Sequence, residues 1–163
     1  MSSQLCANGE KAFLKGEYKH AVQSWKQAIP QLDKEKDVYL HTLLYLTNTY
    51  QATGYYQKAM SSLNTASAKI KDMNNPYWNA ILYSNFGDLF LALGNTEKAE
   101  EILEHGAEAA QLADNTVALA IIFNNLGNVF AADQDLPLAL EKYIRSLELI
   151  QKSPEKYALT TLL

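Results

Sequence analysis

A repeat with a period of about 40 residues restricts the folds that this chain can adopt. Four segments of equal length align over residues 9–21, 47–59, 87–99 and 127–139. Their turn column reads Gly16, Gly54, Gly94 and Gln134, at spacings of 38, 40 and 40 residues. Periods of about 20–50 residues are typical of proteins in which similar supersecondary units pack on their neighbours. The chain is therefore expected to form a row of such units.

Each aligned segment is interpreted as the end of one helix, a turn and the start of a second helix. A glycine just past a helix suits the left-handed cap conformation, and the polar residues Glu17, Asn95 and Asp135 that follow can begin the next helix. Gln134 can take the place of glycine only with backbone strain or with a different turn. Seven glycines and four prolines are too few for a β fold with many tight turns. The sequence therefore predicts an all-α fold of antiparallel helix hairpins.

Small and large residues recur in columns that predict how the two helices of a hairpin pack. Small residues stand in the middle of each first helix, at Gly9, Thr47, Gly87 and Gly127, and early in each second helix, at Ala21, Ala59, Ala99 and Ala139. Glycine inside a helix costs about 1 kcal/mol relative to alanine, so three glycines in one column imply a close approach of the partner helix. Large apolar residues fill the remaining seam of the first helices, at Leu43, Leu46, Tyr50, Tyr83, Phe86, Phe90, Phe123, Leu126 and Phe130.

These columns resemble the tetratricopeptide repeat (TPR) motif, most clearly in Asn124–Phe130 and Gly16–Ala21. The resemblance covers nearly the whole chain and implies a right-handed α-solenoid of antiparallel helix hairpins. On this basis we expect residues 1–163 to form a single TPR array with repeats at about 2–36, 37–75, 76–114 and 115–152. The usual TPR period is about 34 residues, so the longer period here resembles a long-period subtype. Residues 153–163 are either a capping helix or a truncated fifth repeat, and truncation would make the chain part of a larger multidomain protein.

The resemblance also implies that the first helices line a concave groove, and helical spacing then indicates which residues point into it. The predicted peptide-binding residues are His41, Tyr45, Asn48, Ile81, Asn85, Asp88, Ile121, Asn124, Asn125 and Asn128. An amide offers both a donor and an acceptor, which suits the backbone of an extended peptide. Alternatively, some of these asparagines bond to the neighbouring repeat. The apolar positions of the groove could also accept the apolar face of a partner helix.

The charges in these inner columns disfavour one type of TPR ligand. The inner columns also contain Cys6, Glu10 and Ser84, and they contain no Lys or Arg. Chaperone co-factors of the TPR family hold a C-terminal carboxylate with two cations, and that clamp is missing here. No preference for an acidic C-terminus is therefore expected.

Composition argues against several other kinds of partner. The 14 Lys and Arg and 18 Asp and Glu are spread without long runs, so no nucleic-acid surface is expected. No apolar stretch approaches the roughly 20 residues that cross a bilayer, and no membrane contact is expected. The single cysteine, Cys6, excludes an internal disulfide and a multi-thiolate zinc site. The sequence does not fix the compartment, and the cytoplasm is slightly favoured.

No catalytic or metal site is predicted. Cys6 and His41 both fall on inner columns, but no Asp or Asn is placed to orient such a pair. His20 and His105 are interpreted as solvent-facing, and the acidic strip around Glu104 as a solvated helix face. We therefore expect no enzyme activity, no metal and no cofactor. The expected function is a scaffold that binds a protein or peptide in the groove; the alternative is a self-associating module that stacks through its ends, including the C-terminal end face.

Overall fold

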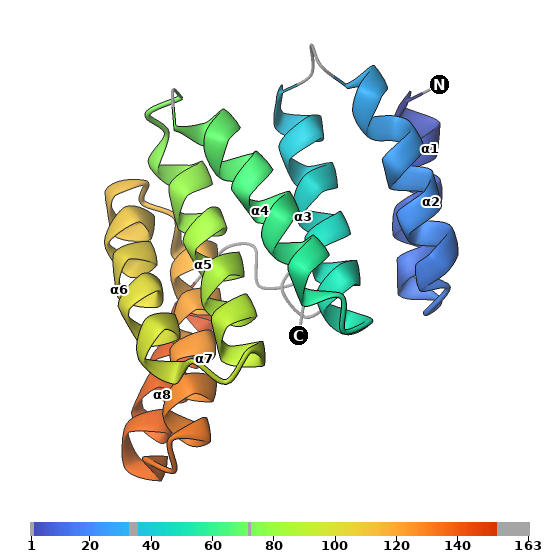
Figure 1. Ribbon diagram of the computed structural model, residues 1–163. Helices are drawn as coiled ribbons and strands as arrows, with labels where there is room; N and C mark the ends of the chain where they lie inside the picture. Colours follow the sequence, from blue (N-terminus) through green and yellow to red (C-terminus); the bar gives the residue numbers. More distant parts are fainter. Residues whose placement is uncertain (1, 33–35, 72, 153–163) are drawn as a thin grey trace. The chain divides into compact units, whose positions relative to one another are not determined.

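The structure is a computed structural model in which residues 2–32, 36–71 and 73–152 are described (Figure 1). The described residues form eight α-helices and one short 3-10 helix, with no strand among them. The helices are α1 (Ser2–Leu14), α2 (Tyr18–Ala28), α3 (Lys36–Ala52), α4 (Tyr56–Ile70), α5 (Pro76–Ala92), α6 (Thr96–Leu112), α7 (Thr116–Ala132) and α8 (Leu136–Lys152), with the 3-10 helix η1 (Ile29–Gln31) after α2. The all-α prediction is confirmed. The predicted capping helix or fifth repeat at 153–163 lies outside the described residues.

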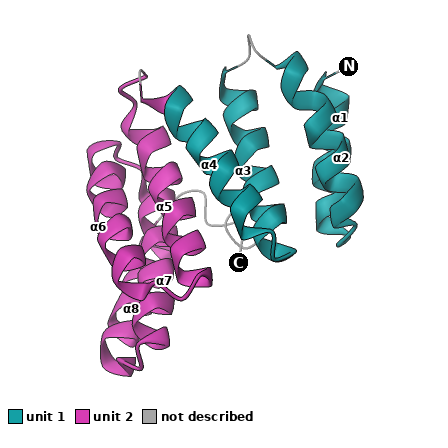
Figure 2. Ribbon diagram, viewed as in Figure 1, with its two compact units in different colours: residues 1–69 teal, residues 70–163 magenta. Residues whose placement is uncertain are grey.

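The helices belong to two compact units of two hairpins each (Figure 2). Unit 1 covers residues 1–69 and contains α1 to α4, and unit 2 covers residues 70–163 and contains α5 to α8. In each hairpin a first helix (α1, α3, α5 or α7) runs antiparallel to the second helix that follows it (Figure 1). A single array with the repeat boundaries given above stays a prediction.

The hairpin turns have the backbone conformation that the turn column predicts. Gly16, Gly54 and Gly94 have φ angles of 73, 75 and 76°. Gln134 has a φ of 64°, so it adopts the same turn under strain rather than a different turn. In the third of these turns the backbone N–H of Asn95 donates to the Phe90 carbonyl at 2.9 Å, which closes the helix end as in a Schellman cap.

The residues that follow the turn column, at Gly16, Gly54, Gly94 and Gln134, cap the second helices only in part. The side chains of Asn95 and Asp135 each accept a hydrogen bond from the backbone N–H three residues later, at 3.0 and 3.1 Å. The side chain of Glu17 makes no such bond, because a glutamate is longer than the usual cap residues. Two turns between hairpins that the sequence reading did not identify carry Asn74 and Asp114, with φ angles of 43 and 49°.

The seam between the helices of a hairpin is as close as the small-residue columns predict. A Cβ atom added to Gly87 would lie closer than 3.0 Å to Leu103, and one added to Gly127 closer than 3.0 Å to the ring of Tyr143. Gly9 faces Trp25 in the same way. The alanines of the second helices are all buried, at Ala21, Ala59, Ala99 and Ala139. The glycines therefore allow large side chains of the second helix to fill the seam.

Within each unit, the second hairpin packs on the first. In unit 2, α7 contacts both α5 and α6, and Leu103, Ile122 and Val129 are fully buried in their shared core. In unit 1, α2 contacts α3, and the buried Ala28 and Leu32 pack near the end of α2. The apolar stripe that one hairpin leaves open is thus covered by its neighbour, as expected for repeats that share a core.

Candidate functional site

Unit 2 brings the predicted groove residues of α5 and α7 together, because these two first helices pack on each other. Five of these residues are half-buried, namely Ile81, Asn85, Asp88, Ile121 and Asn124. Asn125 is buried and Asn128 is exposed. The residues on α5 follow one another at i, i+4 and i+7, which places them along one face of the helix. This face combines apolar surface with hydrogen-bonding groups.

Three of the predicted asparagines already use part of their amide within the protein. Asn125 Nδ2 donates to Ser84 Oγ at 3.2 Å, which links α7 to α5. Asn85 Nδ2 donates at 2.8 Å to the carbonyl four residues earlier in its own helix. Asn128 Oδ1 accepts from the hydroxyl group of Tyr143 at 2.8 Å. The alternative that some asparagines bond to the neighbouring repeat is therefore confirmed for Asn125.

Asp88 is the charged group of this face. Its carboxylate is hydrogen-bonded to the side chain of Asn125. Burial raises the pKa of Asp88 from 3.8 to about 6, and the hydrogen bond from Asn125 opposes this shift. No charged neighbour in the described part of the chain contributes to the shift. Asp88 is therefore largely ionised at neutral pH, without a compensating cation.

In unit 1 the predicted groove residues lie on α3. The ring of Tyr45 stacks on Trp25 of α2, with 5.5 Å between the ring centroids and an angle of 14° between the planes. Partial burial raises the pKa of Tyr45, and the carboxylate of Glu10 on α1 adds to that effect. Asn48 is exposed one turn further along α3. One face of Tyr45 thus serves packing, so this residue offers less to a ligand than its column suggests.

The Cys6 and His41 side chains show no arrangement suited to nucleophilic catalysis. Cys6 is buried, and its Sγ lies 3.4 Å from the Thr42 hydroxyl oxygen. His41 is exposed, but partial desolvation of its ring lowers its pKa by more than Asp37 and Glu10 raise it. Over residues 2–32, 36–71 and 73–152, no group of three His, Cys, Asp or Glu side chains could hold a metal ion.

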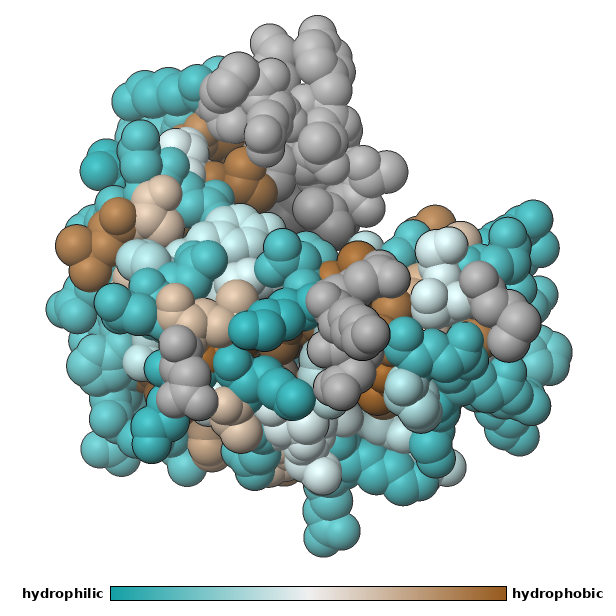
Figure 3. Space-filling model, turned by 90° about the horizontal axis from the view of Figure 1, so that it is seen from above, coloured by the Kyte–Doolittle hydropathy of each residue, from teal (hydrophilic) through white to brown (hydrophobic). Residues whose placement is uncertain are grey.

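The remaining histidines are on the surface, as interpreted from the sequence. His20 and His105 are exposed, and each has a glutamate oxygen near its Nδ1, at 3.5 and 3.9 Å. The face seen in Figure 3 is largely hydrophilic, with apolar residues in small separate patches. No helix in the described ranges combines the length and apolar character needed to cross a membrane.

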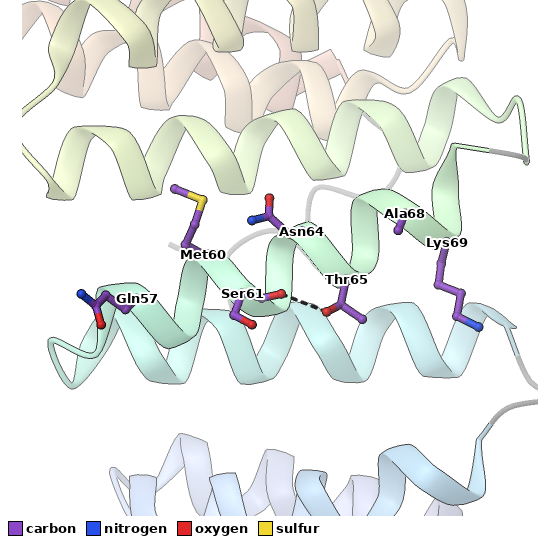
Figure 4. A pocket seen from close by; sticks show the side chains of 7 residues that line it. All are labelled: Gln57, Met60, Ser61, Asn64, Thr65, Ala68 and Lys69. Carbon is purple, nitrogen blue, oxygen red and sulfur yellow. Dashed lines mark hydrogen bonds between the residues drawn. The ribbon is translucent and has the colours of Figure 1, made fainter.

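A shallow hollow along α4 is another surface feature that could receive a ligand (Figure 4). All its lining residues come from this one helix, namely Gln57, Met60, Ser61, Asn64, Thr65, Ala68 and Lys69. Thr65 Oγ1 donates to the backbone carbonyl of Ser61 at 2.9 Å, which is a bond within the helix. The side chains spread along the helix in Figure 4 and do not converge on one point. The α5 and α7 face is therefore the better candidate site.

Comparison with known proteins shows which fold carries this face. No family model and no curated protein matches the sequence. Among solved structures, the chain is similar to BtubC (BKLC) from P. vanneervenii, with a TM-score of 0.75 and 20% identity over 94% of this chain. It is also similar to two structures of a Podosopora anserina protein with nearly identical TPR-like repeats, described as a kinesin light chain. Their TM-scores are 0.68 and 0.56 at 16% identity, over 93% and 94% of this chain and 75% and 99% of theirs.

The fold is TPR-like. This confirms the resemblance seen in the repeat columns and the fold class drawn from it. At these identities the similarity shows the fold alone. The chain spans 63% of the BtubC chain.

The TPR-like arrangement also explains a contact that the sequence reading missed. Asn125 and Ser84 are 41 residues apart, which is one repeat period plus one position. In stacked TPR-like hairpins, successive first helices lie side by side, so residues at this separation can meet. Ser84 belongs to the inner columns of the sequence, so its separation from Asn125 was the signal that could have predicted this contact. The same contact brings the side chain of Asn125 close to Asp88, which lies one turn after Ser84 on α5.

Proposed function

We propose that this chain is a scaffold that binds an extended segment of another protein along the face formed by α5 and α7 of unit 2. One observation carries the proposal: on α5 and α7, the half-buried Ile81 and Ile121 share a helix face, by their spacing, with the hydrogen-bonding side chains of Asp88, Asn124 and Asn128. Apolar area that a ligand can cover and polar groups that fix its orientation are the usual elements of a binding site. The TPR-like fold supports a role in protein interaction in general.

The spacing of these groups favours an extended peptide over a compact ligand. Packed helices have axes about 8–10 Å apart, and an extended chain advances about 3.3 Å per residue. A peptide crossing from α5 to α7 would therefore need about three residues for each helix. Asn124 on α7 is half-buried and can supply a donor and an acceptor to its backbone.

Selection from a random dodecapeptide library on the purified chain tests this function. The affinity of a selected peptide is then measured by fluorescence polarisation for Asn124→Ala. We expect this substitution to weaken binding about three- to tenfold, the equivalent of one lost hydrogen bond. Asn64→Ala, an exposed asparagine on α4, is the matched control and should bind as the wild type does. Unchanged affinity in Asn124→Ala would exclude this face as the site.

A second candidate function is self-association through α8, which carries an exposed apolar stripe. Leu136, Leu140, Ile144 and Leu147 are 66, 59, 50 and 53% exposed. Their spacing of i, i+4, i+8 and i+11 places them on one face of the helix. Contiguous exposed apolar surface of this kind favours association. Light scattering over a concentration series tests this self-association. A mass that rises with concentration in the wild type, and stays at the monomer value in Leu140→Lys, supports stacking. A wild-type mass that stays at the monomer value excludes it.

A further inference from the structure

A polar cluster lies where α7 packs on α5. Asn125 and Ser84 are only 5 and 7% exposed, and Asn125 Nδ2 donates to Ser84 Oγ at 3.2 Å. The same Asn125 side chain is hydrogen-bonded to the carboxylate of Asp88. A buried amide with partners on both sides has little freedom to rotate. The hydrogen-bonded pair of Ser84 and Asn125 thus lies beside the Asp88 carboxylate on the half-buried face.

The cluster carries a negative charge that nothing else in the described structure neutralises. Burial disfavours the ionised form of Asp88, and no charged side chain of the described helices offsets that cost. The inner columns of the sequence contain no Lys or Arg, and their other charged residue is Glu10, again an acid. A partly desolvated carboxylate gains most from a partner of opposite charge.

We propose that Asp88 receives the lysine or arginine side chain of a bound peptide and so makes the face selective for basic segments. This inference rests on the proposed function and names the class of its ligand. A neutral donor could fill a free acceptor position of the carboxylate, but it would leave the charge uncompensated. A cation fills the same position with a charge-assisted hydrogen bond, roughly twice as strong as a neutral one.

Parallel library selections on the wild type and on Asp88→Asn test the inference. Asparagine keeps the size and one acceptor oxygen of aspartate but removes the charge, so the bond to Asn125 can persist. We expect dodecapeptides selected on the wild type to be enriched in Lys and Arg, and those selected on Asp88→Asn to lose that enrichment. Asp133→Asn is the control, because Asp133 is exposed at the end of α7 and its loss changes the net charge equally.

A selected basic peptide and its neutral form then measure the contribution of the charge. In the neutral form, norleucine replaces lysine and citrulline replaces arginine. The wild type and Asp133→Asn should bind the neutral form about tenfold more weakly, whereas Asp88→Asn should bind both forms equally. Asp88→Glu, which restores the charge, should recover part of the preference.

The effect of pH provides an independent readout. Protonation of Asp88 below about pH 6 should weaken binding of the basic peptide to the wild type by up to tenfold, without a matching loss in Asp88→Asn. His41, the titratable histidine of the inner columns, is present in both proteins, so any effect of its charge on binding cancels in the comparison.

Each outcome of these experiments is decisive. Wild-type peptides that are neutral or acidic would overturn the preference for basic segments and leave the peptide-binding function intact. Equal discrimination by Asp88→Asn and the wild type would show that the charge is recognised elsewhere. Failure of the wild type to select any peptide would remove the proposed function itself, and this inference with it.

Discussion

Gly87 and Leu103 make the packing of the third hairpin testable, because we expect one substitution to depend on the other. Gly87→Ala would place a Cβ atom closer than 3.0 Å to Leu103, which is fully buried and has no room to move away. Overpacking of this kind costs about 1–3 kcal/mol, against about 1 kcal/mol gained when alanine replaces a helical glycine. The free energy of unfolding should therefore fall by up to about 2 kcal/mol.

The effect of Gly87→Ala should reverse when Leu103 is shortened. Leu103→Ala alone should cost about 2–5 kcal/mol, because it leaves a cavity in the seam. In that background the new methyl group at position 87 meets no leucine side chain, so the helix-propensity gain of about 1 kcal/mol remains. The double-mutant cycle should give a favourable coupling of about 1–3 kcal/mol.

Guanidinium denaturation followed by circular dichroism supplies the four free energies. Gly94→Ala is the control, because Gly94 has a φ of 76° and no atom within 4 Å of an added Cβ. The cost of that substitution is backbone strain, so it should be the same with leucine or alanine at position 103. If Gly87→Ala has the same effect in both backgrounds, the close seam that we describe is wrong.

Three further predictions concern a turn, the core and the candidate site. Gln134→Gly should raise the free energy of unfolding by about 1 kcal/mol, because Gln134 has a φ of 64°; a thermal melt checks this, and a lower Tm contradicts it. Ala99→Glu should cost several kcal/mol, because Ala99 is fully buried; a variant as resistant to urea as the wild type would refute the register. Burial raises the pKa of Asp88 from 3.8 to about 6, so its contribution to stability is complete below pH 3.8 and is lost as the pH rises through 6. Asp88→Asn should therefore be on the order of 1–3 kcal/mol more stable than the wild type at neutral pH, and it should lose that advantage near pH 4. Denaturation of both proteins at the two pH values measures the difference in stability. A difference that does not change with pH would argue against this reasoning.

The helices and hairpin turns could be predicted because their signals are local. Gly16, Gly54 and Gly94 stand where the chain needs a positive φ, and few other residues tolerate that conformation. The glycines of the seam were informative for a related reason, since each makes room for one large side chain such as Leu103. Which of the two turns Gln134 adopts could not be decided from the sequence, because the packing of α7 on α8 sets its φ of 64° against the residue's own preference.

The candidate site was predictable only to the level of helical columns. Asn85 and Asn125 share a column, yet Asn125 is buried against Ser84 while Asn85 bonds to its own helix. Spacing along one helix fixes the side on which a residue lies, but not how far the next helix reaches over it. Tyr45 shows the same limit, because its stacking partner Trp25 belongs to the second helix of the preceding hairpin.

The most direct test of the account follows the side-chain amide signals of the asparagines by NMR while a library-selected peptide is added. If the face formed by α5 and α7 binds the peptide, the signal of Asn124 shifts in proportion to occupancy, and the signal of Asn64 on α4 stays in place. Shifts confined to Asn64 and other second-helix residues, with Asn124 unchanged, would contradict peptide binding at this face.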